Sequence, residues 1–187
     1  SYIMTKTTQH TRIIHIQDDK NQTLLHLAQE SAQVYNQTLD IFWENMENET
    51  FLSKFDLQKL VTVPRTFLHS QAYQGSIQLF SKAAQTYFKA LKEYPKNPSK
   101  FSGFPHPPKN HKETQLIIFK KPAIRCKKGF LLLSTGDQAN PLKFKWNMCP
   151  PIHATISFNK ETGWQLNCVI EKETDVIQFV KDEILAI

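Results

Sequence analysis

The stretch 153-HATISFNKETGWQLNCVIE-171 decides the fold class of this chain. Apolar and polar residues alternate on both sides of a short polar segment, with the two-residue period of a half-buried strand. The segment from Asn159 to Gly163 ends in a glycine, as a bulged hairpin turn requires. The stretch therefore predicts two antiparallel strands.

Further strands are expected toward the N-terminus. The segments 114–120, 123–134 and 142–146 alternate or are rich in β-branched and aromatic residues, and 127–129 (Lys-Lys-Gly) predicts a hairpin turn. A short strand is also expected at 10–16. Short strands at this spacing are typical of a small barrel.

Between the first strand and the later ones, the apolar period changes to that of helices. Apolar residues from Leu24 to Met46 predict a long helix that frays near Asn48. A capping box at Ser53 predicts a short helix over 54–61. A third helix is expected from Pro64 to Tyr94, because the next residue is a proline. The proline-rich segment 95–108 predicts an extended loop.

The resulting prediction is an α+β chain. Residues 1–17 and 100–176 form a small antiparallel barrel, and residues 18–99 form a helical domain inserted after its first strand. The segment 183–187 predicts the start of another strand.

Composition excludes several classes of protein. No apolar run is long enough to cross a bilayer, and no secretory signal is visible, so we expect a cytoplasmic protein with no membrane partner. The three cysteines, Cys126, Cys149 and Cys168, lack CxxC spacing and predict neither disulfides nor a zinc site. Cys126 and Cys168 are expected to be buried in strands.

The positive charge is concentrated in the middle of the chain. The formal net charge is +6, but 82–145 holds fourteen Lys or Arg against three carboxylates, whereas the remainder is net negative. Segregation of this kind favours a polyanion-binding surface over an ordinary solvated face.

Two sets of residues are candidates for nucleic-acid contacts. The third helix carries neutral polar side chains on one stripe, and glutamine can bind adenine in the major groove of DNA. A solvent-facing helix that is merely rich in glutamine is an equally weighted alternative to a DNA-reading helix. The readers expected on this stripe are Ser70, Gln71, Gln74 and Gln78. The backbone-binding cations expected are Lys82, Lys96, Lys100, Lys109, Lys112, Lys120, Lys121, Arg125, Lys127 and Lys128.

Aromatic residues interleaved with these cations favour base stacking. Phe101 and Phe104 are the candidates among them, and Tyr35 of the first long helix is a third candidate; the alternative is that the aromatics belong to the core.

Catalytic patterns are missing from the sequence. It contains no HExxH, GxSxG or P-loop motif, and Asp182 and Glu183 are neighbours that a strand would point to opposite faces. We expect no catalytic residues, no metal and no cofactor in this chain.

The order of the motifs resembles the TnpB-type RNA-guided nucleases and the related compact type V CRISPR effectors. The resemblance covers 12–187 and rests on 34-VYN-36, 52-LS-53 with 56-DLQKL-60, 70-SQAYQ-74, 103-GFP-105, 140-NPL-142 and 163-GWQL-166.

The resemblance implies a wedge-type barrel with a recognition domain, which together hold a guide RNA and read a short motif beside the target DNA. It implies that residues 177–187 begin a RuvC nuclease domain and that the chain stops before its first catalytic Asp. A RuvC-type nuclease half or a second copy is then a further partner. A repressor-like DNA-binding protein, a protein-interaction module and an enzyme with an unrecognised site are the alternatives.

Overall fold

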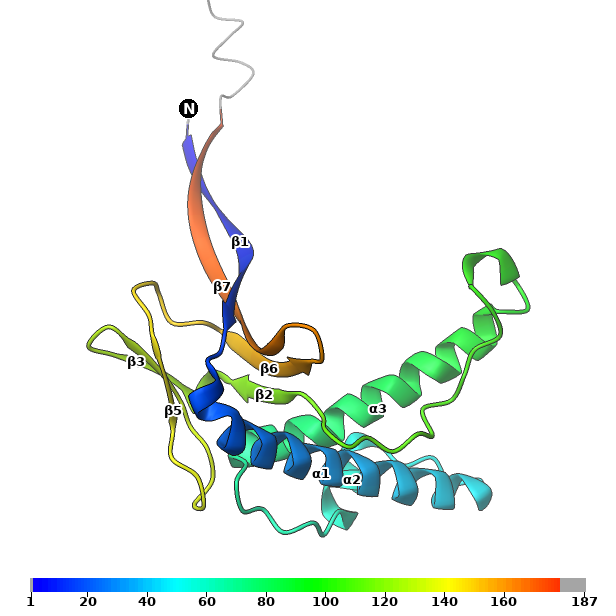
Figure 1. Ribbon diagram of the computed structural model, residues 1–187. Helices are drawn as coiled ribbons and strands as arrows, with labels where there is room; N and C mark the ends of the chain where they lie inside the picture. Colours follow the sequence, from blue (N-terminus) through cyan, green and yellow to red (C-terminus); the bar gives the residue numbers. More distant parts are fainter. Residues whose placement is uncertain (1, 179–187) are drawn as a thin grey trace, which may run out of the picture.

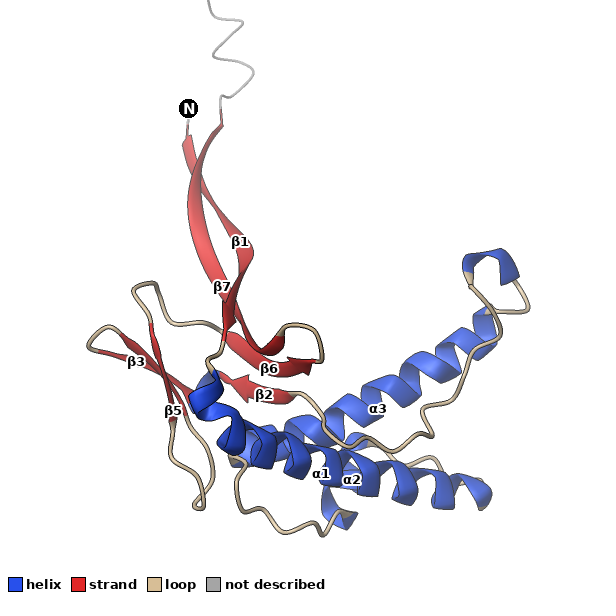
Figure 2. Ribbon diagram, viewed as in Figure 1, coloured by secondary structure: helices blue, strands red, loops and turns tan. Residues whose placement is uncertain are grey.

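A computed structural model describes residues 2–178, and these form an α+β fold in which helices lie beside two antiparallel sheets (Figures 1 and 2). The α-helices of this part are α1 (Asn21–Glu47), α2 (Lys54–Leu60) and α3 (Ser70–Glu93), and the short 3₁₀ turns are η1 (Asp18–Lys20), η2 (Pro98–Lys100) and η3 (Lys121–Ala123). None of these helices has the length and apolar character needed to span a bilayer.

Two of the three helices agree with the sequence prediction. The apolar stripe of α1 is buried, and the helix ends at Glu47, close to the expected fraying point. The hydroxyl of Ser53 accepts a hydrogen bond from the N–H of Asp56, whose carboxylate accepts one from the N–H of Ser53, so the capping box that begins α2 is confirmed.

The third helix begins at Ser70, so the prediction that it opens at Pro64 is wrong. The N–H groups of Thr66, Phe67 and Leu68 are directed to the carboxylate of Glu30 on α1. A helix that opened at Pro64 would direct those N–H groups along its own axis instead. The segment that links α2 to α3 therefore bends at Thr66–Leu68, where three successive N–H groups converge on the carboxylate of α1.

The strands form two separate ladders. One sheet has the order β1-β7-β6-β2 and the other the order β3-β4-β5. Their bounds are β1 Tyr2–His15, β2 Ile117–Lys120, β3 Ile124–Lys127, β4 Phe130–Leu133, β5 Leu142–Lys145, β6 His153–Asn159 and β7 Gly163–Gln178. The first strand joins the later ones, as predicted, because β1 pairs with β7.

Both predicted hairpin turns are present. Gly163 closes the β6–β7 hairpin with a φ of 78°, and Lys128 and Gly129 close the β3–β4 hairpin with φ values of 50° and 79°. Two successive residues of positive φ match the twist of flanking antiparallel strands.

The described strands do not close into one barrel, so that prediction is corrected. The chain passes from the four-stranded sheet to the other through Pro122, and it returns through Pro150 and Pro151. Proline has no N–H to donate to a ladder, so pairing does not continue through either crossing. The two sheets pack face to face instead.

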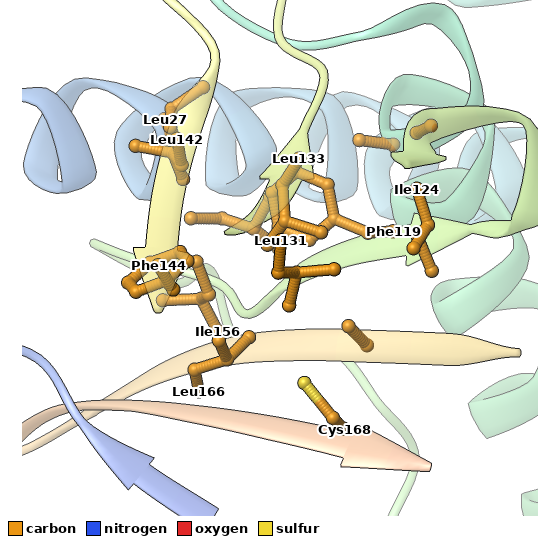
Figure 3. Packing of buried hydrophobic residues seen from close by; sticks show 14 of the residues in the cluster. Leu27, Phe119, Ile124, Leu131, Leu133, Leu142, Phe144, Ile156, Leu166 and Cys168 are labelled. Carbon is orange, nitrogen blue, oxygen red and sulfur yellow. The ribbon is translucent and has the colours of Figure 1, made fainter. Parts of the chain in front are cut away.

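The core lies between the sheets and reaches into the helices. Figure 3 shows Leu131 and Phe144 from the three-stranded sheet facing Ile156 and Leu166 from the other, with Leu27 of α1 in the same cluster. A second cluster lies among the three helices. The first cluster thus crosses the boundary expected between a barrel and an inserted domain.

The predicted strand 183–187 and the carboxylates Asp182 and Glu183 lie outside the described residues.

Candidate nucleic-acid interface

Helix α3 is the platform of the candidate interface. It begins where Nδ1 of His69 accepts the N–H of Gln71 at 3.1 Å, and it ends just before Pro95. Burial lowers the pKa of His69, and the positive charge of Arg65 lowers it further, so the ring is held in the neutral form that accepts this bond.

The buried face of α3 packs on α1 and on β2. A Cβ at Gly75 would lie 3.2 Å from Cβ of Ile118, so glycine permits the close approach of helix and sheet. This packing directs the polar stripe of α3 away from the core.

The four predicted readers, Ser70, Gln71, Gln74 and Gln78, are all half-exposed on α3. One of them touches a predicted backbone-binding cation, since Nζ of Lys120 donates to Oε1 of Gln78 at 2.5 Å. That contact joins the two predicted sets of residues at the junction of α3 and β2.

Lys120 also has a histidine as its neighbour across the strands. It pairs in register with His153 on β6. Burial lowers the pKa of His153, and the neighbouring charge of Lys120 lowers it further. At neutral pH the ring is therefore uncharged and the ammonium is the local cation.

A groove runs along α3 beyond Gln78. Its first part has a volume of about 500 Å³ and lies between the start of α2 and α3. A second part, also of about 500 Å³, adjoins it through Lys82 and Gln85. We call this the α3 groove; its lining includes Phe51, Ser53, Lys54, Phe55, Gln78, Ser81, Lys82, Gln85, Thr86, Phe88, Lys89 and Lys92.

The lining of the α3 groove has one sign of charge. It contains lysines, neutral amides, hydroxyls and aromatic rings, and it contains no carboxylate. The ring of Phe55 is 64% exposed, with Nζ of Lys54 5.1 Å from its centre. The groove thus offers a phosphate-attracting charge next to flat apolar faces.

Several of these residues, including Lys54, Phe55 and Lys89, were not among the site residues predicted from the sequence. The stripe of Gln71, Gln74 and Gln78 continues at steps of three and four through Lys82, Gln85, Lys89 and Lys92, so spacing was a usable signal for these residues. Lys54 and Phe55 had no such signal, because only the tertiary placement of α2 brings them to α3.

The remaining predicted cations are spread over several surfaces. Lys96 and Lys100 lie beyond the end of α3, and Lys100 forms an ion pair with Glu93 at 3.1 Å. Lys109 lies 4.7 Å from the ring of Trp43, and the backbone of Lys112 is bound to Asn36 on α1. The structure does not bring these lysines to the α3 groove.

Arg125 and Lys127 belong to a second cationic surface. Paired positions of an antiparallel ladder share a face, and the register places Arg125 with Lys143 and Lys127 with Lys145 on the outer face of the three-stranded sheet. Lys128 lies in the adjoining turn. We call this the outer sheet face.

The outer sheet face borders an open groove of about 790 Å³. Its lining includes Phe130 and the lysines Lys20, Lys143 and Lys145, together with one carboxylate residue, Asp19. Nζ of Lys143 is 4.0 Å from the centre of the Phe130 ring. Lys20, Lys143 and Lys145 were not among the predicted site residues, although the alternation in β5 was visible in the sequence.

The three predicted stacking residues have different surroundings. Tyr35 is 6% exposed and packs edge-on against Phe80, so its ring has no face open to a base and that prediction is wrong. Phe104 is 59% exposed, and Phe101 is half-buried; both pack against Tyr94 beside a groove of about 740 Å³. Phe104 alone presents most of its ring to solvent.

The two cysteines that were expected to be buried differ in their exposure. Cys168 is buried, as predicted, and burial raises its pKa to about 12, so it stays a thiol. Cys126 is exposed, contrary to the prediction. It lies on β3, an edge strand of the three-stranded sheet, whereas its register partner Leu131 on the central strand is buried. Residues 2–178 contain no group of three or more His, Cys, Asp or Glu side chains arranged to hold a metal.

Comparison with models of known protein families gives no match to this chain. Comparison with curated proteins gives no match either.

Proposed function

We propose that this protein is a nucleic-acid-binding module that holds a guide RNA and reads a short DNA motif beside the target, as the resemblance to the TnpB-type nucleases implies. The observation that carries the proposal is the α3 groove. It is lined by the amides of Gln78 and Gln85, by lysines and by exposed phenylalanines, and its lining has no carboxylate.

The chemistry of the groove supports a division of labour. Amide side chains such as Gln78 and Gln85 make paired hydrogen bonds to base edges, which carry sequence information. Lysines such as Lys82 and Lys89 contact phosphates, which fix position without regard to sequence. In this proposal α1 to α3 act as the recognition part.

The outer sheet face supports a second contact, with RNA. Arg125, Lys127, Lys143 and Lys145 lie on one face, and Lys143 also covers the ring of Phe130. A flat cationic surface of this kind suits the backbone of a structured RNA rather than a base edge. The two sheets act in this proposal as the wedge part, and the chain binds without performing catalysis.

A selection experiment tests the proposal. The purified chain, with any co-purified RNA retained, is allowed to select from a pool of duplex DNA that contains a randomised stretch. Gln78→Ala/Gln85→Ala should reduce the enrichment of the preferred sequence by about 1–3 kcal/mol of discrimination for each lost paired contact. Gln33→Ala, at an exposed glutamine of α1, is the matched control and should leave enrichment unchanged.

Lysine variants give the opposite signature. Lys82→Ala/Lys89→Ala should weaken binding to all sequences and lower the salt slope by about two, because each phosphate contact contributes about one. Enrichment that persists after removal of all RNA would favour the repressor-like alternative. Binding that does not depend on salt would refute the proposal and favour a protein-interaction module.

A further inference from the structure

Strands β1 and β7 form a ribbon that extends away from the rest of the described molecule (Figure 1). β7 pairs with β6 only as far as Val169. Beyond that residue, Tyr2–His10 pairs with Ile170–Gln178 and with no other described strand. A two-stranded ribbon without a further layer is only marginally stable in water, so this free part gains most from a partner.

The free part of the ribbon has two faces of opposite charge. On one face the register places Lys6 beside Thr174, Thr8 beside Lys172, and His10 beside Ile170, with Arg12 next along β1. The other face carries Thr5 beside Asp175, Thr7 beside Glu173, and Gln9 beside Glu171. The side chains of Gln9 and Glu171 are 3.5 Å apart, which confirms that they share a face.

The basic face lies on the side of the three-stranded sheet. Ile170 and Cys168 belong to this face, and both are buried in the core cluster that Leu131 and Phe144 also line. Lys6 and Lys172 therefore lie on the face of the ribbon that continues from the core, while the carboxylates of the ribbon lie on the opposite face.

We propose that the basic face of this ribbon docks in the major groove of duplex DNA. The major groove of B-form DNA is about 12 Å wide and admits a two-stranded β-ribbon, whereas that of A-form RNA is too narrow. At a rise of about 3.4 Å per residue the free part is about 30 Å long, close to one turn of the duplex. The carboxylates repel phosphate and fix which face is presented.

This inference shares its class of ligand with the proposed function, but it rests on a different surface. The probe is a DNA duplex of random sequence and about 20 base pairs, whose affinity is measured over a series of salt concentrations. Lys6→Ala/Lys172→Ala should weaken binding by at least tenfold at low salt and lower the salt slope by about two.

Two matched controls separate position from net charge. Lys59→Ala/Lys160→Ala removes two exposed lysines elsewhere and should change the slope by much less. Glu171→Gln/Glu173→Gln alters the opposite face and should not weaken binding. If the ribbon variant binds like the Lys59/Lys160 variant, or loses affinity equally for an RNA duplex, the inference is overturned. In that event a slope change from Lys82→Ala/Lys89→Ala would still support the proposed function.

Discussion

At the scale of single residues, Glu30 determines where the segment between α2 and α3 lies. It is 4% exposed on α1, and its carboxylate accepts the N–H groups of Thr66, Phe67 and Leu68. A buried carboxylate is tolerated because these donors replace the water that it loses. The start of α3 therefore depends on a side chain about forty positions earlier in the chain.

Glu30→Ala should lower the free energy of unfolding by at least about 3 kcal/mol, because three backbone donors lose their partner and each costs about 1–3 kcal/mol. Denaturant unfolding measures this change. Glu44→Ala, at an exposed carboxylate of the same helix, is the control and should alter stability by less than about 0.5 kcal/mol. Equal effects of the two substitutions would contradict the role assigned to Glu30.

Gly136 illustrates why such residues escape sequence analysis. Its N–H donates to the carbonyl of Phe67, and a Cβ here would lie 2.6 Å from the carbonyl oxygen of Thr66. Nothing in the local sequence of Gly136 or Glu30 reveals these contacts, because their partners are distant in the chain. Positions such as Ser53 and Gly163 were predictable because their partners are near neighbours.

At the scale of helices and strands, the capping box at Ser53 stabilises α2. Ser53→Ala should cost about 1 kcal/mol, since the hydroxyl that accepts the N–H of Asp56 is lost. Ser102→Ala, in an exposed loop, should have no comparable effect on denaturant unfolding. Because Ser53 also lines the α3 groove, the same variant should bind duplex DNA more weakly than Ser102→Ala. Unchanged stability would mean that the box is not formed in solution.

The pH dependence of α2 follows from the same box. The backbone N–H of Ser53 lowers the pKa of Asp56 below 3.8, and the hydroxyl of Ser53 lowers it further. The pKa of Asp56 is thus lower in the folded state than in the unfolded state. The stability that its carboxylate gives to α2 is present above pH 3.8 and is lost as the pH falls through the folded-state pKa.

Helices and turns with a local sequence signal were predicted, but the way the strands divide into two sheets was not. The periods of α1 and α3 and the turn at Gly163 identified these elements from the sequence. The prolines at 122 and 150–151 were visible but were not recognised as the crossings between two sheets. Their effect depends on which strands pair, and pairing is a long-range property.

At the scale of the whole molecule, one hydrophobic core joins the helices to both sheets. Leu24, Leu27 and Leu68 from the helical segment pack in the same cluster as residues of both sheets. We therefore expect a single unfolding transition rather than separate transitions of two domains. The helix signal in far-ultraviolet circular dichroism and the tertiary signal in the near ultraviolet should change at the same temperature. Two transitions well separated in temperature would show that the helices fold independently.

The ladder between β1 and β7 has a consequence for how the protein is made. His15 pairs with Gln165, so about 150 residues must be translated after β1 before its partner exists. At roughly 5–20 residues per second, that interval is on the order of ten to thirty seconds. Throughout it, the nascent chain carries a strand with two unpaired edges, the form most open to pairing with the wrong chain. Lys6 and Arg12 lie within that strand, and their charges oppose such pairing while it waits.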